Sequence, residues 1–458
     1  MKVVIAVHHF PPRYTGGAEW RAYRTAAALQ GRGHDVRVVC VEDILAGPEN
    51  GVSWEDETYQ GIPVRRLSFN RNAAPDPARW EYDNPWIGDH LRGFLQEQQP
   101  DVFHLIGGYL LGADAIRAAR EAGLPVVVTL TDYWFICPRI NLLRSNGQIC
   151  NNDASQNCVR CQAEEKRRYR WAARVLPKLM DVLWASLLAD RVSIPVSLAA
   201  MECRRRVLTE VLGQVDLAIC PSHFLRGVYL RAGAPADRLI HSRQGLALPA
   251  DVIPKSPSDA LRIGYTGQLA EHKGVHLLIE AFKCLNLRTR SATLTIYGDP
   301  THFPKYARRL QKLANGHPGI RFAGTYLHDN LGRVMSELDV LVVPSVWYEN
   351  SPNTILEAFA YQTPVVASDL GGMSELVEHG ESGLLFAPND VMALRRELQR
   401  LVDEPDLVRR LSSSVPRVRT LEEEVDELER LYETTLASSR FPAPALDRSD
   451  GQKQEDNG

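Results

Sequence analysis

Residues 338–361 contain a strand, a loop and a helix that together restrict most strongly what this chain can fold into. The segment opens with the apolar run Leu338–Val343, which is typical of a parallel strand buried on both faces. A Pro-Ser pair ends the strand, and a polar loop leads to Ser351 and Pro352, which are favoured as the N-cap and first residue of a helix. The pattern predicts an α/β sheet whose loop lies at the carboxyl end of the strand, where such sheets bind ligands.

Two glutamates flank the start of this helix. Glu349 lies in the loop, and Glu357 lies on the first turns of the helix, one turn after Asn353. The helix N-terminus between them carries unpaired N–H groups that suit an anion. The arrangement suits a sugar hydroxyl at Glu349, a diphosphate at the helix start and a ribose at Glu357. The alternative is a solvated loop glutamate and an ordinary helix-surface glutamate.

The spacing of Glu349 and Glu357 resembles the E-x7-E signature of the retaining glycosyltransferases of family 4. The residues between them include Asn350, Ser351, Pro352 and Asn353. The resemblance covers the chain from Met1 to about Leu436. It implies the GT-B architecture, in which two Rossmann-like α/β domains face each other across a cleft and a C-terminal helix crosses back to the first domain.

Strand and helix patterns alternate along both halves of the chain, which predicts two mostly parallel sheets. Strands are predicted at 2–7, 35–40, 64–67, 101–105, 126–130 and 215–221, and again at 261–266, 293–297, 321–324, 338–343, 364–368 and 383–386. We predict an N-terminal acceptor domain (1–246), a Pro-rich linker (247–260), a nucleotide-sugar donor domain (261–405), C-terminal helices packed on the first domain (406–438) and a disordered tail (439–458).

Glycines and a lysine at strand-to-helix turns mark the expected donor site. Gly16 and Gly17 permit a phosphate or sugar to approach the backbone, although two glycines in a loop usually form only a turn. Lys273 precedes a helix and is placed to neutralise a leaving diphosphate, the alternative being a surface lysine. The resemblance implies that the donor contacts Gly16, Gly17, Gly267, Gln268, Lys273, Asn350, Ser351, Asn353, Thr354 and Glu357, and that Lys273 and Glu349 are catalytic. Many family members carry arginine where this chain has Gln268.

The acceptor side is predicted from polar residues near strand ends. His104 and Asp132 fall at the carboxyl ends of predicted strands, and Arg13 lies in the glycine loop. A lone histidine at a strand end is more often a packing or hydrogen-bonding residue. The family commonly has a His-Asp pair where this chain has Thr131-Asp132. This chain therefore lacks the histidine that would contact a sugar or acceptor at that position.

Four cysteines lie within one short segment that follows Thr131-Asp132. Cys137, Cys150, Cys158 and Cys161 match the ligand number of a structural zinc site, although their spacing is not that of a standard zinc ribbon. The alternatives are four unrelated thiols or a redox pair at Cys158 and Cys161. No Asp-x-Asp pair occurs, so no metal is implied in catalysis.

Composition limits the partners. The chain has 458 residues, 44% hydrophobic and 24% charged, and a net charge of −3 that gives no sign of nucleic-acid binding. No apolar run spans a membrane and the N-terminus lacks the pattern of a secretory signal, so we expect a cytoplasmic protein. Residues 164–206 form a basic helical pattern that suits peripheral contact with an anionic membrane, or else a packed helix with a solvated face. Its basic residues are Lys166, Arg167, Arg168, Arg170 and Arg174.

These observations predict a retaining, metal-independent glycosyltransferase. Its donor would be a nucleotide-diphosphate sugar and its acceptor a hydroxyl of a saccharide or lipid-linked saccharide, in the synthesis of cell-surface polysaccharide or glycoconjugate. Two alternatives remain: a non-catalytic nucleotide-sugar-binding protein, and another GT-B enzyme such as a nucleotide-sugar epimerase or a phosphorylase.

Overall fold

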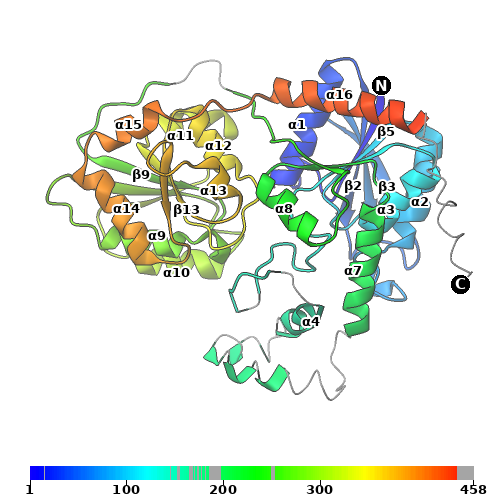
Figure 1. Ribbon diagram of the computed structural model, residues 1–458, viewed down its shortest axis with the longest axis horizontal. Coiled ribbons are helices and arrows are strands. Elements are labelled where there is room, and N and C mark those ends of the chain that lie inside the picture. Colours follow the sequence, from blue (N-terminus) through cyan, green and yellow to red (C-terminus); the bar gives the residue numbers. More distant parts are fainter. Residues whose placement is uncertain are drawn as a thin grey trace, which may run out of the picture.

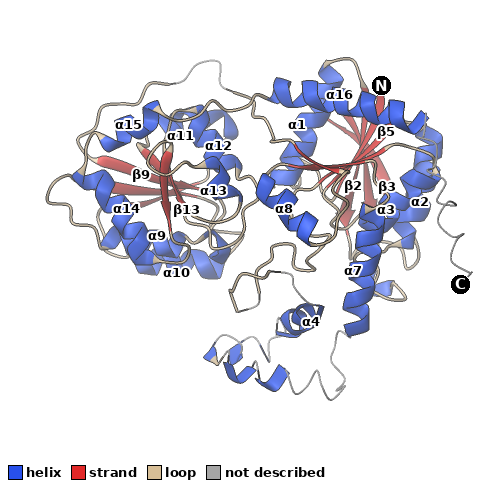
Figure 2. Cartoon of the chain, in the orientation of Figure 1, coloured by secondary structure: helices blue, strands red, loops and turns tan. Residues whose placement is uncertain are grey.

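The computed structural model describes residues 1–14, 16–144, 146–151, 155–164, 169, 171–172, 175–176, 178–180, 182–184, 198–248 and 253–440. Figure 1 shows two α/β domains next to each other, and Figure 2 shows that each has a central sheet covered by helices. This is the predicted fold class, with a first sheet built from residues 2–241 and a second from residues 261–386.

The first domain has an eight-stranded sheet in the order β3-β4-β2-β1-β5-β6-β7-β8. The strands are β1 (Lys2–Val7), β2 (Asp35–Asp43), β3 (Ser53–Tyr59), β4 (Ile62–Ser68), β5 (Val102–Ile106), β6 (Val126–Thr129), β7 (Leu217–Cys220) and β8 (Leu239–His241). The helices are α1 (Gly17–Gly31), α2 (Pro85–Gln98), α3 (Gly112–Glu121), α4 (Ser155–Glu164), α7 (Leu198–Leu212) and α8 (His223–Arg231). β3 pairs antiparallel with β4, and the other strand pairs are parallel.

The second domain has a six-stranded parallel sheet in the order β11-β10-β9-β12-β13-β14. Its strands are β9 (Leu261–Thr266), β10 (Ala292–Tyr297), β11 (Ile320–Gly324), β12 (Val340–Val343), β13 (Val365–Ser368) and β14 (Gly383–Phe386). The helices are α9 (Val275–Lys283), α10 (Pro304–Ala314), α11 (Leu331–Ser336), α12 (Asn353–Ala360), α13 (Gly372–Leu376), α14 (Val391–Asp403), α15 (Leu407–Ser413) and α16 (Leu421–Arg440).

Buried strands are the elements that the sequence predicts best. β1, β9 and β14 have the predicted bounds, because each consists mostly of buried residues and is ended by a loop. The strand β3 was missed, because its sequence SWEDETY is mostly exposed and polar at the edge of the sheet. The N-cap prediction at Ser351 is wrong: Pro352 has extended backbone and α12 begins at Asn353, so the Ser351 hydroxyl lies too early in the chain to cap the helix.

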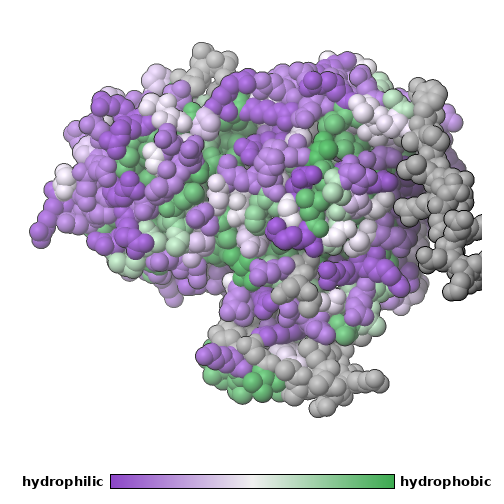
Figure 3. All heavy atoms as spheres, viewed as in Figure 1, coloured by the Kyte–Doolittle hydropathy of each residue, from purple (hydrophilic) through white to green (hydrophobic). Residues whose placement is uncertain are grey.

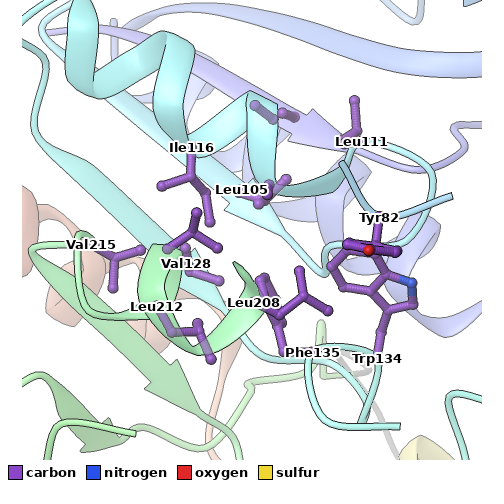
Figure 4. Packing of buried hydrophobic residues seen from close by; sticks show 14 of the residues in the cluster. Tyr82, Leu105, Leu111, Ile116, Val128, Trp134, Phe135, Leu208, Leu212 and Val215 are labelled. Atoms are coloured by element: carbon purple, nitrogen blue, oxygen red, sulfur yellow. The ribbon is translucent and has the colours of Figure 1, made fainter. Parts of the chain in front are cut away.

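Aromatic and branched side chains fill the core of the first domain between its sheet and helices α3 and α7. Figure 4 shows Leu105 and Val128 from the strands facing Ile116 of α3 and Leu208 of α7. Trp134 lies at the edge of this cluster and is almost fully buried. It follows the loop after β6 directly, so the core fixes the position of that loop.

The C-terminal helices belong to both domains, which corrects one predicted boundary. Residues 406–438 were predicted to pack on the first domain, but Leu407 and Leu411 of α15 lie in the core of the second domain. They are one helical turn apart and form one apolar face. The chain crosses back after α15, and α16 then lies along α1, where Arg21 pairs with Glu424 at 2.7 Å (Figure 1).

Several sequence predictions lie outside the described residues. They include the basic residues Lys166, Arg167, Arg168, Arg170 and Arg174, the tail beyond Arg440 and residues 249–252 of the linker. Close to the basic residues in sequence, Trp171, Leu179 and Val182 are 69%, 63% and 68% exposed, and Figure 3 shows hydrophobic side chains on the segment that projects below the domains. No helix among the described residues is long and apolar enough to span a bilayer. Contact with a membrane stays a prediction.

We expect Tyr432 to be a principal anchor of α16. Its ring is fully buried and its hydroxyl lies 2.6 Å from His104 Nδ1. Tyr432→Ala should lower the free energy of unfolding by about 3–5 kcal/mol through the cavity it leaves. Tyr432→Phe should lower it by about 1–2 kcal/mol through the lost hydrogen bond. Urea unfolding followed by circular dichroism measures both, and equal losses for the two variants would contradict an anchoring role for the ring.

Candidate active site

A cleft of about 580 Å³ lies between the two domains and collects most of the predicted donor residues. The first domain lines it with the glycine loop and with the loop after β6. The second domain lines it with the loop before α9 and with the loop between β12 and α12. Predicted residues on its walls are Gly16, Gly17, Thr131, Asp132, Gly267, Gln268, Lys273, Glu349, Asn350, Ser351, Asn353 and Thr354.

Lys273 and Glu349 form an ion pair on the wall of this cleft. Lys273 Nζ lies 2.6 Å from Glu349 Oε1, and the same oxygen accepts hydrogen bonds from Ser345 Oγ and Trp347 Nε1, both at 2.7 Å. The ammonium also lies 5.1 Å from the centre of the Trp347 ring. The lysine is thereby held at one point on the wall, facing the space between the domains.

Burial alone would raise the pKa of Glu349. The charge of Lys273 and the hydrogen bonds from Lys273, Ser345 and Trp347 outweigh burial, so the pKa of Glu349 lies below its ordinary value. The neighbouring His272 has its pKa lowered to about 4 by burial and by the charge of Lys273. At neutral pH the pair is therefore ionised and His272 is uncharged, which leaves Lys273 as the cation of this loop.

Two glycines permit close backbone contacts around this ion pair. At Gly274 (φ +70°) a Cβ atom would lie 1.9 Å from the carbonyl oxygen of Pro344, so only glycine lets the Lys273 loop lie against the end of β12. At Gly372 a Cβ atom would lie 1.6 Å from the carbonyl oxygen of Asn350. The Gly372 N–H donates to the Glu349 carbonyl at 2.8 Å and supports the loop from below.

Hydrogen bonds across the cleft hold the domains together. Asn350 accepts from Ser222 Oγ at 2.7 Å and donates to the carbonyl of Thr131 at 3.2 Å. Ser222 is also the N-cap of α8, and Glu375 of the second domain accepts from the N–H of His223 at 3.0 Å. The side chain of Asn350 bridges the domains because both of its polar ends find partners in the first domain. Asn350 also lines the cleft, and its predicted contact with the donor stays a prediction.

The start of α12 opens onto the cleft. Thr354 lines it, and Asn353 accepts a hydrogen bond from Gln244 of the first domain. Glu357, one turn further along α12, is not among the described residues that line this cavity. Its charge acts instead on Arg24 of α1 and on Tyr326. The predicted contact of Glu357 with a ribose stays a prediction.

A histidine and a glutamate on the opposite wall were missed by sequence analysis. His8 Nε2 lies 3.2 Å from Glu19 Oε1, both side chains are largely buried, and both line the cleft. Burial raises the pKa of Glu19, but the hydrogen bond and charge of His8 outweigh it, so its pKa lies below the ordinary value. His8 directly follows β1, at the carboxyl end of a strand, and this position was the available signal.

Two of the three predicted acceptor residues lie elsewhere. His104 is buried between Tyr432 and Thr129, and burial lowers its pKa to about 3, so it packs α16 onto the sheet. Arg13 pairs with Glu42 at 2.8 Å on the first domain, away from the lining of the cleft. Both corrections have the same cause: folding brings each side chain next to a hydrogen-bond or ion-pair partner that is distant in sequence. Asp132 does line the cleft, and burial raises its pKa.

The four clustered cysteines come into one neighbourhood. Burial and the nearby thiols of Cys137, Cys150 and Cys161 raise the pKa of Cys158 to about 12. Within the described part of the chain, no three or more His, Cys, Asp or Glu side chains are arranged to hold a metal ion. Zinc binding by the cysteines stays a prediction.

Comparison with known proteins decides the family. A model described as a glycosyl transferase 4-like domain matches residues 16–241, and one described as glycosyl transferases group 1 matches residues 260–404. This chain belongs to glycosyltransferase family 4. The resemblance to that family is thus confirmed, and the chain is a glycosyltransferase.

Several relatives and solved structures match this glycosyltransferase over most of its length. It is 25% identical to a glycogen synthase of Mycobacterium tuberculosis over 90% of this chain and 88% of that protein. It is 24% identical to a GDP-mannose-dependent α-mannosyltransferase of Corynebacterium glutamicum, over 84% and 76%. Sucrose-phosphate synthase of Thermosynechococcus elongatus superposes with a TM-score of 0.65 at 19% identity, over 95% of this chain and 99% of that one. Anabaena HepE, solved with UDP and glucose, superposes with a TM-score of 0.62 at 16% identity, over 95% and 100%. The fold is GT-B.

Gly372→Ala should displace the loop that carries Glu349, because its Cβ atom has no room beside Asn350. We expect donor turnover to fall at least about tenfold, which corresponds to about 1.4 kcal/mol. The matched control is Gly93→Ala on α2, where an added Cβ atom meets nothing within 4 Å. Steady-state kinetics measures the effect. Equal turnover in both variants would mean that close packing of Gly372 against the Glu349 loop is not needed for activity.

Glu349 should make stability depend on pH. Its folded-state pKa lies below the ordinary 4.5, so its stabilising contribution is present above that value and is lost as pH falls through the lowered pKa. Wild type should therefore be more stable than Glu349→Gln near neutral pH by about 1–3 kcal/mol, and the difference should shrink in acid. Urea unfolding at a series of pH values measures the difference, and a constant gap would contradict the assignment.

Proposed function

We propose that this glycosyltransferase moves a sugar, with retention of anomeric configuration and without a catalytic metal, from a nucleotide-diphosphate donor to a hydroxyl of a saccharide or lipid-linked saccharide. The observation that carries the proposal is the Lys273–Glu349 ion pair on the donor wall of the interdomain cleft. The product is a cell-surface polysaccharide or glycoconjugate, as is the case for the named pathways of several relatives, which include colanic acid and amylovoran synthesis.

Departure of the diphosphate places a large negative charge in the cleft. Lys273 carries the compensating positive charge, and the N-terminal N–H groups of α12 add to it. Gln268 supplies no charge at the position where many relatives of this family carry arginine, so Lys273 bears more of the stabilisation. A diphosphate that binds Lys273 shares the ammonium with Glu349.

Glu349 orients the donor sugar in this proposal. Its Oε1 atom is occupied by Lys273, Ser345 and Trp347, and the carboxylate lies on the cleft wall as a hydroxyl acceptor. Such a fixed carboxylate positions the sugar beside the leaving group without attacking it. Acceptor and diphosphate then act on the same face of an oxocarbenium-like sugar, which gives retention without a covalent intermediate.

The His8–Glu19 pair faces this site from the first domain. The contact between His8 Nε2 and Glu19 Oε1 holds the ring in one orientation on the first-domain wall of the cleft. His8 places an imidazole on the same wall of the cleft as Thr131. At the position of Thr131 the family commonly has a histidine. We assign His8 to contacts with hydroxyls of the donor sugar or the acceptor.

A donor screen tests the proposal. HepE was solved with UDP, so UDP is titrated first by calorimetry, followed by GDP and ADP. One nucleotide should bind, and Lys273→Ala should weaken it about tenfold to hundredfold, since a hydrogen bond to a charged group is worth about 1.5–3 kcal/mol. Lys305→Ala, an exposed lysine on α10, is the control and should bind normally.

Turnover then separates the alternatives. With the sugar nucleotide that matches the bound nucleotide, the enzyme should transfer or hydrolyse the sugar in the presence of a chelator, and NMR should show a product with the anomeric configuration of the donor. Binding without turnover would favour the nucleotide-sugar-binding protein. Interconversion of the free sugar nucleotides would favour the epimerase. An inverted product would refute the retaining mechanism.

A further inference from the structure

A second cavity, of about 130 Å³, lies beside the cleft, between the cysteine-containing loop and helix α8. Tyr348 lines both cavities, and it is the residue before Glu349. A molecule that presents a hydroxyl in the cleft can therefore extend past Tyr348 into the second cavity. None of the predicted donor residues lines this second cavity, so its occupant is the part of the acceptor away from the reacting hydroxyl.

Two aromatic rings form one side of this cavity. The rings of Phe224 and Tyr348 lie 4.7 Å apart at an angle of 43°, and each is partly exposed. Phe224 comes from the first turn of α8 in the first domain, and Tyr348 comes from the second domain. Partly exposed aromatic faces offer apolar contact and a polar hydroxyl together, which is a surface that suits the C–H faces of a sugar ring.

Arg231 supplies the positive charge of the cavity. It lies in the last turn of α8, and its guanidinium forms no hydrogen bond or ion pair with the described residues. Its charge reaches Tyr348, where it opposes the rise in pKa that burial causes. A basic residue in the last turn is also favoured by the helix dipole, but its place on the wall of a cavity next to two aromatic rings gives it a ligand-facing role as well. Guanidinium binds carboxylate and phosphate groups through paired hydrogen bonds.

We propose that this cavity is an acceptor subsite that binds an anionic saccharide, with the sugar against Phe224 and Tyr348 and its carboxylate or phosphate on Arg231. The proposal rests on the proposed function, because it assigns the acceptor of the same reaction. It narrows that acceptor from any saccharide to one that carries a negative charge at a distance from the reacting hydroxyl. The cysteine-containing loop forms the outer wall through Cys150 and Asn151, so this insertion shapes acceptor choice.

Ligand-observed NMR with small probes tests the subsite. Glucuronic acid and glucose 6-phosphate separate the carboxylate and phosphate forms of the ligand, and methyl glucoside is the neutral probe. At least one anionic sugar should bind wild type more tightly than methyl glucoside does. Arg231→Ala should weaken that anionic sugar about tenfold, while its nucleotide binding stays unchanged. The matched control is Arg396→Ala on α14, an exposed arginine far along the second domain.

Two further variants distinguish this cavity from the donor site. Lys273→Ala should weaken nucleotide binding about tenfold to hundredfold and keep the anionic sugar, whereas Phe224→Ala should weaken the anionic sugar and keep the nucleotide. Failure of the donor screen with intact anionic-sugar binding would overturn the proposed function alone. The subsite would be overturned if neither anionic sugar bound, if methyl glucoside bound as tightly, or if Arg231→Ala and Arg396→Ala behaved alike.

Discussion

The ion pair between Lys273 and Glu349 is the contact on which the donor side of the cleft depends. It joins the loop before α9 to the loop after β12, and these loops can meet because Gly274 leaves no side chain between their backbones. A buried carboxylate without its cation would be costly, and a buried lysine likewise. The pair therefore fixes both residues on the wall of the cleft.

The second constraint is the way in which the domains are held in contact. Asn350 and Glu375 belong to the second domain but satisfy hydrogen-bonding groups of the first, at Ser222, Thr131 and the N-terminus of α8. Helix α16 completes the connection, since it leaves the second domain and packs on α1 through Glu424 and Tyr432. The loop that carries Glu349 thus also carries a contact between domains, so donor binding and domain closure act on the same few residues.

The same geometry explains why the acceptor side is harder to assign than the donor side. The predicted donor residues come largely from two loops close together in the second domain. The residues that we propose for the acceptor side come from distant parts of the chain and include His8, Thr131, Tyr348 and Phe224. Tyr348 separates the reacting cleft from the smaller cavity beside it. The side chain of Tyr348 therefore lies between the cleft, where we propose that the bond forms, and the cavity that we assign to acceptor choice.

The sequence by itself determined the fold class and most of the buried strands, and it predicted residues of the second domain that the fold gathers on the wall of the cleft. Buried parallel strands are continuous apolar runs, and the two glutamates and Lys273 lie next to such runs, so local pattern sufficed. Only the tertiary structure decided the roles of His104, Arg13 and Asn350. Each of these residues has a partner that is distant in sequence: His104 contacts Tyr432, Arg13 pairs with Glu42, and Asn350 accepts from Ser222. These contacts hold His104 and Arg13 away from the cleft and turn the Asn350 side chain toward the other domain. His8 and Arg231 gained importance for the same reason, because a cavity wall is a property of the assembled chain.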